Sequence, residues 1–371
     1  MLASDALTPG ENLVRTKRPR NAPRHFYVVK RAEPLHAPAT RLPRTAMLYR
    51  PLGQTSIHVS AVAFGAGPVP ALLTGEDRRR QVEVVAAAIG AGINWFDTAP
   101  TYGDGASEES LGAALAELGA NEVHVASKIR VNLQHDGNYR EFVLATVRDS
   151  LRRLRVPRLA LLQLHNAITE RDGDLPSSVS AARVLAPHGI LDALEAARRE
   201  GLCSHLGLTG IGAPAALREV LESSRFAAAQ IPFSIVQPSA GYPVRGTGID
   251  DYDELFVDCR RCGVAALAIR VFAGGAISGQ PPSEHTKRTP YFPLAVFECD
   301  RRRADRIAAV LPQGLSIVEA AARFAAHHPA VTSAIIGMAS TAQVRDTVRY
   351  VDAGPLSDGA IRAIMQAAAA D

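Results

Sequence analysis

The sequence has 371 residues, of which 47% are hydrophobic and 21% are charged, enough to build one large or two medium globular domains. It contains no apolar run of the roughly 18 residues that a membrane-spanning helix needs, and four cysteines in so long a chain favour a reducing, cytoplasmic compartment over a disulfide framework. The formal net charge is +4, but residues 1–46 alone carry +6, which leaves −2 on the remainder. The basic balance therefore gives no reason to expect a nucleic-acid partner.

Residues 1–46 differ in character from the rest of the chain. They hold six prolines and show neither a helical nor a strand period, so we predict a disordered extension. Their Arg-rich, acid-poor composition allows an organellar transit peptide, although the segment is not clearly amphipathic. We favour a third hypothesis, in which translation begins at Met47. Mass spectrometry of the native amino terminus distinguishes these alternatives, because peptides from residues 1–46 would exclude a start at Met47.

From residue 47 onward, the hydrophobic pattern alternates between strands and helices. A hairpin is predicted first, over residues 49–60. Buried runs then predict strands at 59–64, 93–97, 123–128, 159–165, 204–209, 227–231, 264–269 and 332–336. Helical spacing predicts helices at 78–91, 108–118, 142–154, 190–200, 214–222, 252–261, 301–310, 316–327 and 341–351. Ser107 is expected to be the N-cap of the second helix, and a long irregular stretch is expected over 270–300.

These elements form eight strand–helix units with a spacing of about 30 residues, which is typical of βα repeats. Eight units without a second domain favour a closed (β/α)8 TIM barrel over an open sheet. We therefore expect residues 47–371 to form one α/β barrel with an N-terminal hairpin and a long loop after the seventh strand. Reactive groups of such barrels gather at the carboxyl ends of the strands. The residues at or beside these ends are Asp97, Lys128, His165, Thr209, Gln230, Arg270 and Gly337.

Four side chains near the first of these strand ends form a chemical set. After residue 46 only Lys128 and Lys287 remain as lysines, against 37 arginines in the chain, so a lysine at a strand end indicates a task for a compact ammonium. A phenol such as Tyr102 is a weak acid, and a neighbouring ammonium, fixed by Asp97, favours its ionised form. His165 can then orient a carbonyl oxygen against the phenol. Singly, each residue has a structural explanation as a turn former or a packed core group.

The residues around this set carry a resemblance to a known family. Residues 96–103, with Ser107-Glu108 and Leu111-Gly112, resemble the aldo-keto reductase signature, and so do residues 126–128 and 161–166. The resemblance spans about residues 49–351. It implies a (β/α)8 barrel, a nicotinamide cofactor and hydride transfer to or from an aldehyde, ketone or aldose. The implied catalytic tetrad is Asp97, Tyr102, Lys128 and His165, in which Tyr102 exchanges the proton on oxygen, Lys128 tunes it, Asp97 holds Lys128 and His165 positions the oxygen.

The resemblance also implies contacts with the cofactor. The pair of the family that binds the nicotinamide amide is Thr209-Gly210 here, so a hydroxyl is kept and an amide is lost, while Gln230, which shares this task, is present. The stacking aromatic after strand seven falls on Ile269 or Arg270. Residues 270–275 resemble the loop over the pyrophosphate, where glycines allow close backbone approach. The implied contacts are Gly65, Thr209, Gln230, Arg270, Phe272, Gly274, Gly337, Ser340, Gln343 and Arg345.

The nucleotide preference depends on residues 336–347, which resemble the segment that binds the adenosine phosphate at a helix N-terminus. Gln343 stands where a basic residue often binds the 2′-phosphate, and Thr347 replaces an asparagine. Arg345 can compensate only if it turns toward the phosphate. NADP is therefore the expected cofactor, and NAD is the alternative.

The substrate and the oligomeric state are not fixed by these motifs. Residues 64–67 and 328–333 are similar to the branch that includes galactose- and fucose-type aldose dehydrogenases, which favours oxidation of a lactol. Substrate choice is expected in loops at 132–138, 168–188, 238–249 and 279–293. The alternative function is a nicotinamide-binding regulatory or partner subunit with little turnover. The absence of a His-x-His pair argues against a metal-dependent hydrolase, so no metal is expected.

Overall fold

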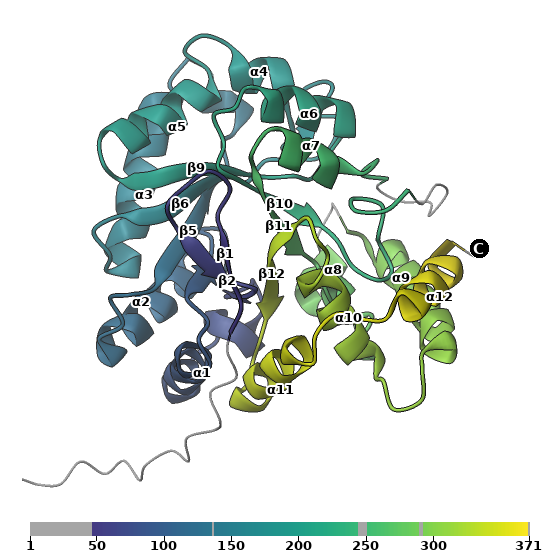
Figure 1. Cartoon of the computed structure of the whole chain (residues 1–371). Helices are drawn as coiled ribbons and strands as arrows, with labels where there is room; N and C mark the ends of the chain where they lie inside the picture. The colour runs from purple at the N-terminus through teal and green to yellow at the C-terminus, as the bar shows by residue number, and fades with distance from the viewer. Residues whose placement is uncertain (1–46, 136, 244–250, 289–291, 370–371) are drawn as a thin grey trace, which may run out of the picture. The chain divides into compact units, whose positions relative to one another are not determined.

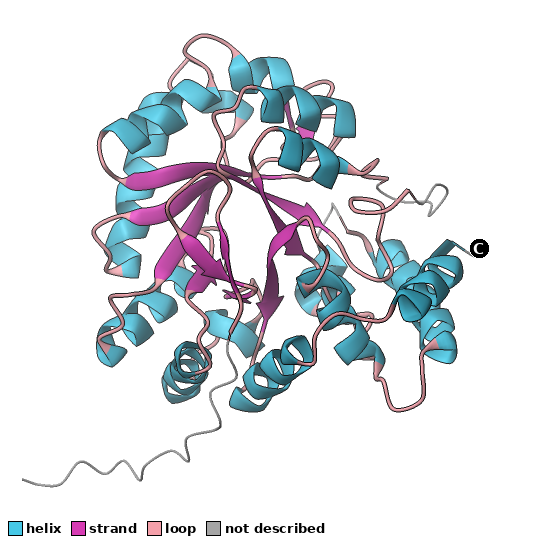
Figure 2. Cartoon of the chain, viewed as in Figure 1, coloured by secondary structure: helices cyan, strands magenta, loops and turns pink. Residues whose placement is uncertain are grey.

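The structure is a computed structural model, and it describes residues 47–135, 137–243, 251–288 and 292–369. The predictions for residues 1–46, and for loop residues 136, 244–250 and 289–291, lie outside the described residues. Within them, eight parallel strands close into a barrel in the order β3-β4-β5-β6-β9-β10-β11-β12, and helices surround it (Figures 1 and 2). The predicted (β/α)8 fold is thereby confirmed. No helix of the described ranges is long and apolar enough to cross a membrane.

The strands and helices of the barrel follow the predicted alternation closely. The barrel strands are β3 (Val62–Gly65), β4 (Trp95–Asp97), β5 (His124–Ile129), β6 (Leu159–Leu164), β9 (Cys203–Thr209), β10 (Ala228–Pro232), β11 (Ala265–Ile269) and β12 (Val331–Gly337). The predicted helices are α1 (Arg78–Gly90), α2 (Ala106–Leu118), α3 (Tyr139–Leu154), α5 (Ile190–Arg199), α6 (Pro214–Glu222), α7 (Leu255–Arg261), α9 (Leu294–Val310), α10 (Ile317–Ala326) and α11 (Thr341–Asp352).

Several short elements were not predicted. They are η1 (Pro70–Thr74), η2 (Leu133–His135), β7 (Ile168–Thr169), β8 (Val179–Ser180), α4 (Ala181–Leu185), η3 (Ala273–Gly275) and α8 (Glu284–Arg288), together with the longer terminal helix α12 (Asp358–Ala369). The prediction of an irregular stretch over 270–300 was therefore wrong in part. Pro293 is extended and leads directly into α9, seven residues earlier than the periodicity indicated.

The predicted hairpin is confirmed as β1 (Tyr49–Pro51) paired antiparallel with β2 (His58–Ser60). Its buried Leu52 and Val59 join an apolar cluster with inward-facing residues of the barrel strands, so the hairpin closes the amino end of the barrel. The strand predicted over 59–64 is divided, because the chain turns between β2 and β3. The Asn94 side chain accepts a hydrogen bond from the Ser60 amide at this turn, at 2.8 Å.

The inside of the barrel has an apolar layer and, above it, a polar layer. Side chains of a strand alternate between the two faces, so residues two positions apart point the same way. The apolar layer includes Ala63, Trp95, Ala126, Leu161 and Ala228. Two positions further along the same strands stand Gly65, Asp97, Lys128, Gln163 and Gln230. The period of two thus gathers polar side chains at the carboxyl end, where the sequence places the reactive groups.

Candidate active site

The centre of the polar layer is a buried ion pair between Lys128 and Asp97. Lys128 Nζ donates to Asp97 Oδ2 at 2.5 Å and to the Thr98 carbonyl at 2.8 Å, and the two charged side chains are only 1% and 5% exposed. Burial acts to lower the pKa of Lys128, but the charge of Asp97, followed by Tyr102, outweighs it and holds that pKa above its ordinary value. The ammonium therefore stays charged at neutral pH.

Two glutamines complete the environment of Asp97. Gln163 Nε2 and Gln230 Nε2 both donate to Asp97 Oδ1, at 2.9 Å and 2.5 Å. Gln163 was not predicted to take part, although a single amide within a run of leucines on β6 was a signal for a buried polar contact. Gln230, for which a contact with the nicotinamide amide is predicted, uses its amide nitrogen to bind Asp97. The carboxylate is thus fixed by three side-chain donors.

Tyr102 and His165 lie on the open side of this ion pair. Tyr102, on the loop between β4 and α2, is half-buried and its Oη lies 3.3 Å from Lys128 Nζ. The ammonium also lies 4.9 Å from the centroid of the phenol ring. The His165 ring meets the same phenol edge-on, with 5.9 Å between centroids. The four residues predicted as a tetrad are therefore brought together by the fold.

His165 directly follows the last residue of β6, and its backbone amide donates to the Ile129 carbonyl at 2.7 Å. Burial, followed by the nearby charges of Lys128 and Arg130, lowers the pKa of His165 well below its ordinary value. The imidazole is consequently neutral at neutral pH, which leaves it able to hydrogen-bond a substrate oxygen without adding a second cation beside Lys128.

This shift gives a testable pH dependence. We expect the His165 Cε1–H signal, in NMR spectra of histidine-labelled protein, not to titrate between pH 8 and 6. Because the pKa of His165 is lower in the folded chain than in the unfolded chain, the unfolded chain binds the proton first as the pH falls. His165 therefore does not affect the free energy of unfolding above about pH 6.5, the unfolded pKa, and lowers that free energy below it. The signal is assigned by its loss in His165→Gln. A titration midpoint near 6.5 would contradict the prediction.

The predicted cofactor contacts Thr209, Gly65 and Gly337 lie at the ends of their strands, in or beside this polar layer. Thr209 ends β9, and its buried Oγ1 has no hydrogen-bond partner among the described residues; the same holds for His165 Nδ1. Gly65 and Gly337 are register partners where β3 and β12 end. A buried hydroxyl at this end of the barrel fits the amide group of a nicotinamide, which carries both donor and acceptor atoms.

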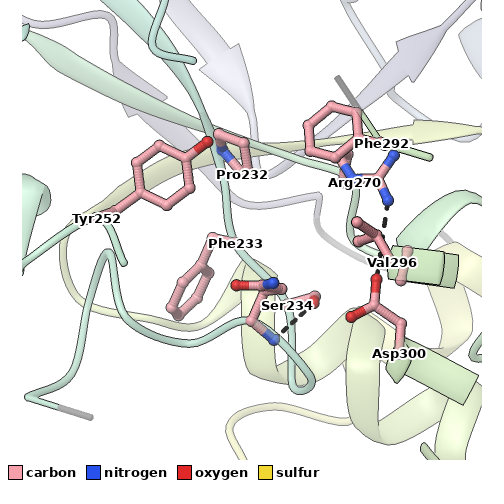
Figure 3. A pocket seen from close by; sticks show the side chains of 10 residues that line it. Pro232, Phe233, Ser234, Tyr252, Arg270, Phe292, Val296 and Asp300 are labelled. Atoms are coloured by element: carbon pink, nitrogen blue, oxygen red, sulfur yellow. Dashed lines mark hydrogen bonds and ion pairs between the residues drawn. The ribbon is translucent and has the colours of Figure 1, made fainter. Parts of the chain in front are cut away.

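Residues of the predicted pyrophosphate loop, 270–275, contact other parts of the protein. Figure 3 shows Arg270 beside Phe292 and Asp300. The Arg270 guanidinium lies 3.8 Å from the carboxylate of Asp300 and 3.6 Å from the centroid of the Phe292 ring. Phe272 packs against the hydrophobic core. In η3, the amide of Gly275 donates to the Phe272 carbonyl at 2.9 Å, and Gly274 has a left-handed φ of 67°. Arg270 and the loop glycines are near the strand ends, as predicted, and the arginine forms an ion pair with Asp300.

The predicted adenosine-phosphate segment forms the N-terminus of α11. Ser340 is its N-cap, and its Oγ accepts from the Gln343 amide at 3.2 Å. Gln343 Oε1 accepts from the Ala339 amide at 2.6 Å, while Arg345 is exposed. A residue that was not predicted, Arg80 of α1, donates through Nε to the Ala339 carbonyl at 2.9 Å. Arg80 thus places a cation beside this helix end, 259 residues away in sequence.

Comparisons with known proteins point to one family. The Aldo/keto reductase family profile matches residues 61–369. The chain is 26% identical over 309 residues to the L-galactose dehydrogenase of Arabidopsis thaliana, covering 83% of this chain and 89% of that protein. It is 27% identical over 317 residues to a D-threo-aldose 1-dehydrogenase of Pseudomonas sp, covering 79% and 89%.

A solved structure supports the fold. The holo form of an aldo-keto reductase from Bacillus halodurans superposes with a TM-score of 0.66 at 24% identity, covering 87% of this chain and 97% of that one. The family profile extends from before the first barrel strand into the last helix, so it includes every strand that contributes to the polar layer. The chain therefore belongs to the aldo/keto reductase family.

Proposed function

We propose that this NAD(P)-dependent oxidoreductase acts on an aldose, which it oxidises at the anomeric carbon, with Tyr102 as the general acid/base. The observation that carries the proposal is the position of Lys128, which is buried between Asp97 and Tyr102. The preference for an aldose over a simple aldehyde or ketone is supported by relatives described as L-galactose dehydrogenase and D-threo-aldose 1-dehydrogenase.

Each residue of the tetrad has a separate task in this proposal. The nicotinamide, when bound, supplies or accepts the hydride. Tyr102, as a phenolate, takes the proton from the sugar hydroxyl as the carbonyl forms and becomes a phenol, which returns the proton in the reverse direction. Lys128 stabilises negative charge on the phenol oxygen, because it is a fixed ammonium whose side chain is only 1% exposed. Asp97, held by Gln163 and Gln230, keeps Lys128 in place. The neutral His165 orients the substrate oxygen toward Tyr102.

For the cofactor, we propose NADP, held by Thr209 at the nicotinamide and by Ser340 with the N-terminus of α11 at the adenosine phosphate. Anions favour such a helix end, because its free amides and dipole are positive. Gln343 itself is neutral and is engaged with the Ala339 amide. The cations on or near this helix end are Arg345 and Arg80, which supports binding of a 2′-phosphate despite the missing basic residue.

A steady-state screen of aldoses, aldehydes and ketones with NADP and with NAD tests both proposals on the full chain. We expect turnover of an aldose and a higher kcat/KM with NADP than with NAD. A preference for NAD would show that Gln343 marks a lost phosphate contact. Binding of either nucleotide without turnover of any compound would favour the alternative, a regulatory or partner subunit.

A further inference from the structure

We propose that Glu108 is a positioning residue, which sets the separation between Tyr102 and Lys128. It does so by clamping the tyrosine loop, residues 98–105 between β4 and α2, to strand β5. The inference rests on the proposed function, since it assigns a second layer of residues to the same acid/base pair. The prediction that the preceding Ser107 is the N-cap of this helix is wrong. The N-cap of α2 is Gly105, and Ser107 and Glu108 are buried inside the first turn.

The first arm of the clamp runs from Glu108 to the strand that carries Lys128. Glu108 is completely buried, and its Oε1 accepts a hydrogen bond from Ser127 Oγ at 2.5 Å. Ser127 is the residue before Lys128 on β5, so the two side chains point to opposite faces of the strand. Glu108 therefore holds β5 from the helix side at the point where Lys128 projects into the barrel.

The second arm holds the tyrosine loop through Ser107. The Ser107 amide donates to the Tyr102 carbonyl at 3.2 Å, which ties the backbone of the tyrosine to the start of α2. The Ser107 hydroxyl lies 2.8 Å from Thr98 Oγ1, and the Thr98 carbonyl is a hydrogen-bond acceptor for Lys128. Two adjacent residues of one helical turn thus contact the backbone of Tyr102 and the strand of Lys128.

Arg153 of α3 binds Glu108 in the first turn of α2 from the outer side of the barrel. Its Nε donates to Glu108 Oε2 at 2.7 Å, which neutralises a carboxylate that would otherwise be buried and unpaired. The arginine side chain crosses the loop at Gly105, where φ is 95° and an added Cβ would lie 2.9 Å from Arg153 Cδ. The left-handed φ favours glycine at this position, and the Arg153 side chain packs against the loop after Tyr102.

The contacts of Glu108 affect the reaction because proton transfer at Tyr102 depends on the distance between its Oη and Lys128 Nζ. Tyr102 Oη and Lys128 Nζ lie 3.3 Å apart, and they belong to different segments, a loop and a strand. A displacement of about 1 Å in an active site can cost on the order of 100-fold in rate. Without the Glu108 contacts, the start of α2 loses its side-chain tie to Ser127 of β5. The loop that carries Tyr102 is then joined to β5 only near its first residue, where the Thr98 amide donates to the Ala126 carbonyl at 3.0 Å, and through Lys128 itself.

The test compares Glu108→Gln with Glu195→Gln in the full chain. Glu195 is a matched control, since it is 2% exposed and also pairs with two groups, Arg198 and Arg225, on the outside of the barrel. We expect E108Q to lower kcat roughly 10- to 100-fold with an unchanged dissociation constant for the cofactor, and E195Q to leave both unchanged. Thermal unfolding of both variants measures the structural cost. Equal kcat values for E108Q and E195Q would overturn the proposal.

A second readout does not require turnover. The chain has four lysines, so lysine labelled at Cε gives few NMR signals, and the Lys128 signal is the one lost in Lys128→Arg. We expect E108Q to move it, because the Tyr102 ring lies over the ammonium, and E195Q to leave it in place. Failure of the proposed function would appear as no turnover by the native chain, with this shift still observed. If E108Q does not fold, Ser127→Ala removes one arm; an unmoved Lys128 signal there would also overturn the proposal.

Discussion

Tyr102→Phe is expected to lower kcat by about 10²- to 10⁴-fold, the usual contribution of a positioned general acid or base. Phenylalanine keeps the ring that meets His165 edge-on at 5.9 Å and the ring face near Lys128. It removes only Oη, the atom 3.3 Å from the ammonium. Cofactor affinity should therefore be retained, so that the loss appears in kcat and in single-turnover rates while a fluorescence titration of the nucleotide stays normal.

The control for this substitution is Tyr49→Phe at the opposite end of the barrel. Tyr49 Oη donates to the Gly92 carbonyl at 2.7 Å, so the change removes one hydroxyl and one hydrogen bond, about 0.5–1.5 kcal/mol of stability. Turnover should be unaffected because Tyr49 belongs to the hairpin that closes the amino end. Near-normal turnover by the Tyr102 variant would remove Tyr102 as the acid/base of the reaction.

The sequence predicted the polar layer well because its members follow local rules. Asp97 ends a short apolar run and Lys128 lies near the end of a strand with alternating polarity, and each stands two residues after an inward-facing apolar side chain. Alternation along a strand and the parallel direction of all strands are sufficient to bring such residues to one end of the barrel. Neither step requires knowledge of which side chains touch.

Contacts across the barrel were harder to predict because they depend on closure. Gln163 and Gln230 reach Asp97 from strands β6 and β10, neither of which pairs with β4, and they are separated from it by 66 and 133 residues. Ser107 shows a different difficulty. A serine before two acids is a common helix start, but its hydroxyl is used by Thr98 in the buried interior, and a left-handed Gly105 begins the helix instead.

The contacts that residues on the cofactor side make within the protein were not predicted, since these residues lie on loops whose backbone conformation has no local period. Arg270 adopts a left-handed φ of 57° and is held by Asp300, on a helix that the sequence did not predict to begin so early. Arg80 reaches Ala339 only because α1 and α11 are neighbours once the barrel closes. Tertiary contacts, and not propensity, decide both positions.

Lys128→Arg should impair the enzyme severely although the positive charge is kept. The ammonium fits among Asp97 Oδ2, the Thr98 carbonyl and Tyr102 Oη, at 2.5, 2.8 and 3.3 Å, in a site that is 1% exposed. A guanidinium is larger and planar, with five donors in a fixed fork. Forcing it into this space costs roughly 1–3 kcal/mol of stability from overpacking, and it displaces either Tyr102 or Asp97. We expect kcat to fall about 100-fold or more, by the cost of such misplacement.

Lys287→Arg is the matched control, because Lys287 is the other lysine after residue 46 and is half-exposed, paired with Glu284 at 2.7 Å. Its replacement should change neither kcat nor the denaturant midpoint, since exposed pairs contribute only about 0–1 kcal/mol. Lys128→Met separates charge from shape: it leaves Asp97 buried without its cation, which costs about 3–5 kcal/mol. If Lys128→Arg kept full activity, a fixed positive charge would suffice beside Tyr102. If both Lys128 variants lose activity and only the methionine variant loses most of its stability, the reaction depends on the compact geometry of the ammonium and the fold depends on its charge.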